Sequence, residues 1–113
     1  MINLNALAKK QYESTKKRAT NPYSNVKADP ISCLKHAAGE VVEATEAYTR
    51  LTCAEARLGH ADCTLKQDLV FELADIICCV MSCAAQLDVD LEDAISDRVA
   101  NNMLRADGIG DKA

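Results

Sequence analysis

The sequence predicts an all-α protein, an antiparallel bundle of about four helices that assembles into an oligomer. Almost half of the 113 residues are apolar, yet aromatic residues make up only 4% and tryptophan is absent. A core of small aliphatic side chains suits closely packed helices better than sheets. Apolar residues also recur at helical spacing over four segments, and no segment alternates as a strand does. The length predicts a single domain covering residues 1–113.

The first predicted helix covers residues 3–18. It carries an apolar stripe, with lysine and arginine on its other sides, and the stripe consists of Leu4, Leu7, Ala8 and Tyr12. Residues 19–29 contain Asn21-Pro22 and many small polar residues, which predicts a loop.

The remaining predicted helices span residues 30–105. The second begins at Pro30, with Asp29 as its N-cap, and continues to about Leu58, where Gly59 is suited to end it. A polar Thr-x-x-Gln pattern at residues 64–67 predicts the start of the third helix.

The third predicted helix ends near Leu87, and Asp90 is the predicted N-cap of a fourth that ends near Arg105. Its predicted inner edge carries Leu91, Ile95, Val99 and either Asn102 or Met103. Residues 106–113, which include two glycines, are predicted to fray.

The segment 76–85 predicts self-association, because Ser82 is its one clearly polar residue. A helix that is apolar on all sides must be buried on all sides. One small domain rarely surrounds a helix completely, so we expect a homodimer or a dimer of dimers.

Charge and cysteine positions limit the possible environments. A net charge of −4 argues against binding a nucleic-acid polymer, and no apolar run approaches the roughly 20 residues of a membrane span. The start of the chain, MINLNALAKK, has lysines where a secretory signal would be apolar, so we expect a cytoplasmic protein with six free thiols. Zinc is disfavoured because no Cys-x-x-Cys pair occurs.

Two acidic pairs are the candidates for chemistry: Glu40 with Glu43, and Glu72 with Asp75. Residues three apart share a helix face, so each helix directs two carboxylates the same way. Four converging carboxylates would repel unless a cation lay between them, and oxygen ligands favour Mg2+, with Mn2+ possible in its place. Iron is disfavoured because neither pair includes the histidine of a Glu-x-x-His motif. Solvated surface carboxylates are the simpler interpretation of either pair alone.

The segments GEVVEATEAY and FELADIICCVMSCAAQLDVDLEDAISDRVANNMLR, within about residues 31–105, resemble the MazG-like all-α nucleoside triphosphate pyrophosphatases. The resemblance implies Mg2+-dependent hydrolysis of (deoxy)nucleoside triphosphates to the monophosphate and pyrophosphate. The metal ligands that it implies are Glu40, Glu43, Glu72 and Asp75. It further implies that Asn102 and Arg105, together with Arg98, contact the phosphates or sugar of the substrate.

Two positions depart from that family. Gly39 stands where the family often has a further glutamate, and Asn101 stands where a lysine is common. The first departure bears on the number of bound metals or on the base that activates water. The second predicts either weaker phosphate binding or phosphate contacts from Lys35 or N-terminal lysines. His36, one turn before Glu40, is a further candidate for substrate contact.

Glu43 is expected to hold the most central place in the cluster, because small alanines flank it on the helix. Two other functions stay open at this stage. One is a phosphoribosyl-ATP pyrophosphohydrolase, which would share the metal site. The other is a catalytically inactive helical dimerisation module.

Overall fold

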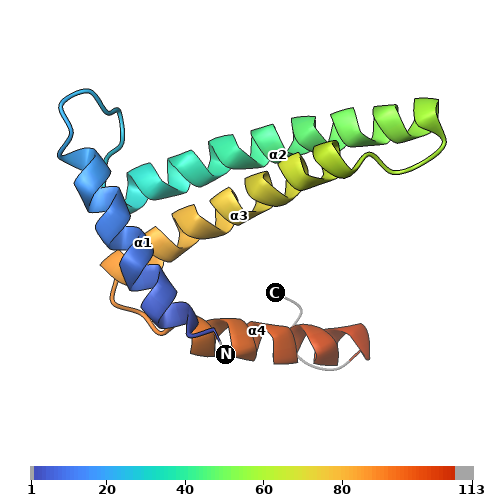
Figure 1. Ribbon diagram of the computed structural model, residues 1–113. Helices are drawn as coiled ribbons and strands as arrows, with labels where there is room; N and C mark the ends of the chain where they lie inside the picture. Colours follow the sequence, from blue (N-terminus) through green and yellow to red (C-terminus); the bar gives the residue numbers. More distant parts are fainter. Residues whose placement is uncertain (1, 109–113) are drawn as a thin grey trace.

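Four helices make up the fold of the protein, whose computed structural model describes residues 2–108 (Figure 1). They are α1 (Leu4–Ala19), α2 (Pro30–Leu58), α3 (Cys63–Gln86) and α4 (Leu91–Ala106). No strand occurs among residues 2–108. The all-α prediction is therefore confirmed.

The ends of α2 form where the sequence predicts them. The side chain of Asp29 accepts a hydrogen bond from the Ser32 N–H, which satisfies one of the unpaired donors of the first turn. Pro30 occupies the first helical position, where an N–H is not needed. Gly59 ends the helix at a φ of 73°, a left-handed conformation that glycine adopts without steric cost.

The predicted start of α3 is wrong by one or two residues. Asp62, and not Thr64, is the N-cap, and its side chain accepts a hydrogen bond from the Leu65 N–H. The positive N-terminal end of the helix dipole also stabilises a carboxylate at this position. Asp62 therefore caps the helix in place of Thr64. Asp90 caps α4 as predicted, and part of the predicted tail, residues 109–113, lies outside the described residues.

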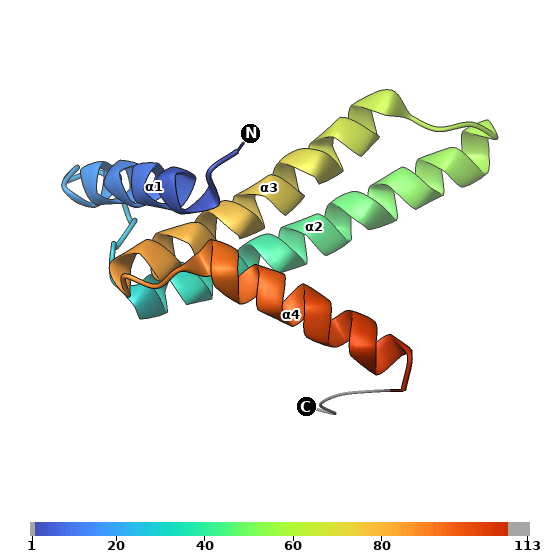
Figure 2. The ribbon, with the colours of Figure 1, turned by 90° about the horizontal axis from the view of Figure 1, so that it is seen from below.

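The helices α2 and α3 form a long antiparallel hairpin (Figures 1 and 2). Its buried residues are mostly small, which lets the two backbones approach closely. They are Cys33, Ala37, Ala44, Ala47, Leu51 and Ala54 on α2, and Met81, Ser82, Cys83 and Ala84 on α3. Within residues 2–108 no helix has both the length and the apolar character needed to cross a membrane.

The helix α1 packs across the C-terminal half of α3, around a buried polar contact. The hydroxyls of Thr15 and Ser82 lie 2.7 Å apart, and Thr15 also donates to the carbonyl oxygen of Gln11 at 3.0 Å. Ser82 therefore donates to Thr15, and both buried hydroxyls are satisfied. This pairing fixes the register of α1 on α3.

The helix α4 diverges from the hairpin, and hydrogen bonds hold its first turn against the start of α1 (Figure 1). Asn5 Nδ2 donates to Asp90 Oδ1 at 2.8 Å, and the Glu92 N–H donates to Asn5 Oδ1 at 3.2 Å. No residue of α4 is buried, and Val99 and Met103 on its predicted inner edge are 55% and 64% exposed.

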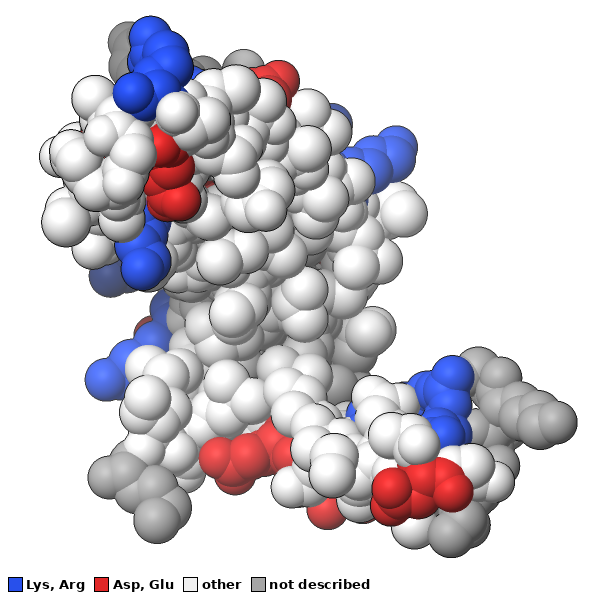
Figure 3. Space-filling model, turned by 90° about the vertical axis from the view of Figure 1, so that its right-hand side faces the viewer, with Lys and Arg blue, Asp and Glu red and all other residues white. Residues whose placement is uncertain are grey.

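The single chain is consequently extended. Its radius of gyration is 17.2 Å, whereas a compact domain of this length has one of about 13 Å. In Figure 3 few charged side chains cover the area between the hairpin above and α4 below. Large apolar side chains are exposed on both elements, for example Phe71 and Ile77 on α3 and Val99 and Met103 on α4, so one chain leaves apolar surface uncovered on each.

The short connection between α3 and α4 is a Schellman motif. The Val89 N–H donates to the Ala84 carbonyl at 3.3 Å, and the Asp88 N–H donates to the Ala85 carbonyl at 3.2 Å. Asp88 has a φ of 52°, the left-handed conformation that glycine usually supplies here. These bonds determine the direction in which α4 leaves the hairpin.

Candidate active site

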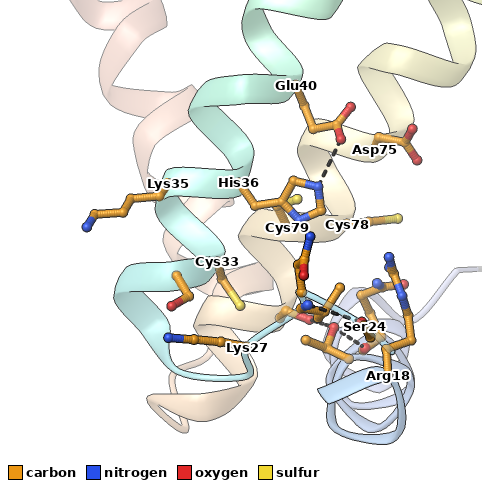
Figure 4. A pocket seen from close by; sticks show the side chains of 16 residues that line it. Arg18, Ser24, Lys27, Cys33, Lys35, His36, Glu40, Asp75, Cys78 and Cys79 are labelled. Atoms are coloured by element: carbon orange, nitrogen blue, oxygen red, sulfur yellow. Dashed lines mark hydrogen bonds and ion pairs between the residues drawn. The ribbon is translucent and has the colours of Figure 1, made fainter. Parts of the chain in front are cut away.

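A cavity of about 650 Å³ opens where α1, the loop after it, the start of α2 and the second half of α3 meet (Figure 4). Its lining combines cations, acids and thiols. The acidic and basic members are Arg18, Lys27, Lys35, His36, Glu40 and Asp75, and the thiols are Cys33, Cys78 and Cys79.

Three carboxylates converge beside this cavity. One oxygen each from Glu40 and Glu43 on α2 and from Glu72 on α3 lie within 4.8 Å of one another. The Glu40 side chain is only 13% exposed, whereas Glu43 is exposed. The Oε2 atoms of Glu40 and Glu72 are buried and have no hydrogen-bond partner. Buried carboxylate oxygens without a donor are costly, so the cluster favours a proton or a cation between its members.

Glu40 is the member of the cluster with a strongly shifted pKa. The pKa of Glu40 is raised to about 7, and burial is the largest cause. Hydrogen bonding of its protonated form to Glu43 and Glu72, and then repulsion by Glu43 and Asp75, add to the effect. His36 Nε2 contacts Glu40 Oε1 at 3.0 Å, whereas the buried Oε2 has no partner. Glu40 is thus more enclosed than Glu43, and the central role expected of Glu43 stays a prediction.

The structure brings together most, but not all, of the predicted site residues. Asp75 lies outside the 4.8 Å trio but lines the cavity, as do Lys35 and His36. Arg98, Asn102 and Arg105 are all on α4 and do not line it. Arg105 Nη1 instead donates to Asn102 Oδ1 at 3.1 Å. Within one chain, the two groups of predicted residues are separate.

Comparisons of this chain with protein-family models, with curated proteins and with solved structures find no match. Its chemistry is therefore inferred from the side chains. Among residues 2–108 the carboxylate trio is the one group of three or more acidic, histidine or cysteine residues close enough to hold a metal ion. All its donor atoms are oxygen, which suits hard divalent cations.

The thiols of the cavity are poorly suited to act as nucleophiles. Burial, followed by the nearby charge of Glu40, raises the pKa of Cys79 to about 11. Burial likewise raises the pKa of Cys33 and of Cys78. A protonated thiol is a weak nucleophile, so these cysteines serve as small wall residues.

Sequence reasoning expected lysines of the first helix near the phosphates, but none of the lysines of α1 lines the cavity, and other residues of α1 do. Gln11, Thr15 and Arg18 all line it, and they follow one another at spacings of four and three residues. That spacing places them on one helix face. A polar face beside the apolar stripe of the first helix was the signal that could have identified them.

Proposed function

We propose that this protein hydrolyses (deoxy)nucleoside triphosphates to the monophosphate and pyrophosphate, with Mg2+ or Mn2+ as cofactor. The observation that supports this most is the pair of buried oxygens, Glu40 Oε2 and Glu72 Oε2, that lack a partner beside a large cavity. Together with Glu43 they supply a negatively charged, all-oxygen donor set. Such sites take hard cations that keep phosphates and water in their remaining positions.

The residues of the trio fit the metal that the sequence resemblance implies. Glu40, Glu43 and Glu72 would hold it, since their oxygens converge without a donor between them. A bound Mg2+ neutralises charge on phosphate oxygens and polarises the phosphorus.

The other acidic and basic residues have distinct proposed roles. Asp75 lines the cavity but lies outside the trio, so its carboxylate is available to accept the proton of an attacking water. The contact of His36 with Glu40 Oε1 would orient that carboxylate and leave Oε2 available to the metal.

We also propose that a second copy of the chain covers the exposed apolar surface, as a homodimer or a dimer of dimers. The arguments are the unburied α4, the apolar side chains of Phe71 and Ile77 at 61% and 54% exposure, and the large radius of gyration. Assembly of this kind is the route by which Asn102, Arg105 and Arg98 of one chain would reach the cavity of another. A cytoplasmic location belongs to the same proposal, since nucleoside triphosphates are held there.

Two alternatives make different predictions. A phosphoribosyl-ATP pyrophosphohydrolase would use the same carboxylates on a larger substrate. An inactive helical dimerisation module would show neither Mg2+ binding nor hydrolysis, and fold alone does not separate it from an enzyme.

The decisive experiment measures pyrophosphate release from a panel of all common NTPs and dNTPs and from phosphoribosyl-ATP, with Mg2+ and with EDTA. We expect Mg2+-dependent release from at least one nucleotide. Glu72→Gln should abolish it, while Glu46→Gln, at an exposed position on α2, should not. Absence of release from every nucleotide, in a folded protein, would overturn the proposal.

A further inference from the structure

Arg18 is one of three basic residues of the cavity, with Lys27 and Lys35, that pair with no acidic residue among residues 2–108. It lies in the last turn of α1, and its side chain lines the same cavity as Glu40 and Asp75. Among residues 2–108 the one close contact between a basic and an acidic side chain is that of His36 with Glu40. The guanidinium group is therefore unpaired at one end of a cavity that has carboxylates at its other end.

The direction of the side chains separates Arg18 from the two lysines. In Figure 4 Arg18 extends from α1 toward the side of the cavity where Cys78 and Asp75 lie. Lys27 and Lys35 also line the cavity, but in this view their side chains extend away from Arg18. Arg18 is thus the basic group best directed to a molecule inside the cavity.

The chemistry of the two ends defines the ligand. A guanidinium offers a planar set of N–H donors that binds phosphate oxygens in pairs. The carboxylate end accepts an anion only together with a divalent cation. A phosphate chain carrying a bound cation satisfies both ends, whereas a single phosphate satisfies one of them.

We propose that Arg18 binds the phosphate chain of the ligand in this cavity, and that the ligand must contain at least two linked phosphates. This inference rests on the proposed function, and it assigns to α1 a phosphate contact that the sequence resemblance places on α4. The adjoining loop contributes the neutral polar side chains of Ser24 and Asn25 to the cavity, and Ser24 lies near Arg18 in Figure 4.

Calorimetric binding of inorganic tripolyphosphate in the presence of Mg2+ tests the inference without requiring turnover. Arg18→Gln should weaken binding by about ten- to one-hundred-fold, the range expected for losing a hydrogen-bonded ion pair. Arg18→Lys keeps the charge but not the paired donors and should give an intermediate loss. The matched control is Lys17→Gln, which removes the same charge at a neighbouring exposed position outside the cavity and should change binding less than about twofold.

Several outcomes would overturn the inference: no tripolyphosphate binding by the parent protein, equal binding by Arg18→Gln, or an equal loss in Lys17→Gln. Arg18 is exposed and has no ion pair, so the variant should melt at the parent temperature and remain testable. If Arg18→Gln loses tripolyphosphate binding but the parent protein releases no pyrophosphate from any nucleotide, the phosphate contact stands and the proposed function fails. If the parent protein hydrolyses nucleotides and Arg18→Gln keeps its KM and kcat, the proposed function stands and this inference fails.

Discussion

Replacing Glu40 by glutamine should stabilise the metal-free protein above neutral pH. Glutamine keeps the size of the side chain and an oxygen for the His36 contact, but it removes a charge that is only 13% exposed. The pKa of Glu40 rises from an ordinary value of 4.5 to about 7, with burial as the main cause. The folded state therefore binds this proton more tightly than the unfolded state does.

The sign of the pH dependence follows from that difference. Below about pH 4.5 both states are protonated at Glu40, and its carboxyl group does not destabilise the fold. As the pH rises from 4.5 to about 7, the unfolded state loses its proton first, and the stability of the fold falls. At 1.36 kcal/mol per pH unit the upper limit is about 3 kcal/mol. Solvent screening through the open cavity and the exposed Glu43 reduces this to about 1–2 kcal/mol.

Urea unfolding followed by circular dichroism, in EDTA at pH 5 and pH 8, measures the effect. The parent protein should lose about 1–2 kcal/mol more than Glu40→Gln between these pH values, and Glu46→Gln should behave as the parent. The hydrogen bond from Ser32 that lowers the pKa of Asp29, and the one from Asn5 that lowers the pKa of Asp90, act below this window and do not interfere. The reasoning is refuted if Glu40→Gln is the less stable protein at pH 8, or if the two proteins show the same pH dependence.

Four further outcomes are expected. Glu43→Gln and Asp75→Asn should each abolish pyrophosphate release, and Glu43→Gln should also remove the Mg2+-induced rise in melting temperature; parent-like rates would disprove the assigned roles. Light scattering at micromolar concentration should give at least a dimer mass, and Val99→Lys on the exposed face of α4 should lower it; a monomeric parent would contradict the apolar-surface argument. Alkylation of the unfolded protein without reductant should modify all six cysteines, since all are unpaired; fewer than six adducts in freshly purified protein would reveal a disulfide. Gly39→Ala should raise the free energy of unfolding by about 0.5–1 kcal/mol, because a helical glycine is entropically costly and no atom lies within 4 Å of the added Cβ; a loss of stability would show that the site needs the glycine.

Local chemistry made much of the fold predictable. Asp29 with Pro30 and Gly59 bound a helix through side-chain and backbone preferences that hardly depend on the rest of the chain. The convergence of Glu40 and Glu43 follows from helical spacing in the same way. Spacing alone could not place Glu72 beside them, because that depends on the register of α2 on α3, which small buried alanines determine.

The features that sequence reasoning missed arise from packing between distant segments. Arg18 reaches the cavity because Thr15 binds Ser82, a contact across 67 positions of the chain. Periodicity likewise marked Ile95 and Val99 as an inner edge, but it carries no information on which surface covers that edge. The depth of Glu40 relative to Glu43 depends on how far α3 overlaps each of them, which also requires the tertiary structure.

The Schellman motif after α3 has a consequence for the entropy of assembly. Hydrogen bonds at residues 84–89, and those of Asn5 with Asp90 and Glu92, set the direction of α4. The helix is therefore held in one orientation before it meets a partner. A helix whose orientation is already fixed loses less conformational freedom on association than a mobile helix does. This favours tight binding from a modest contact area. The left-handed φ of Asp88 thus matters for residues far from it, because a change in this one dihedral angle would redirect the whole of α4.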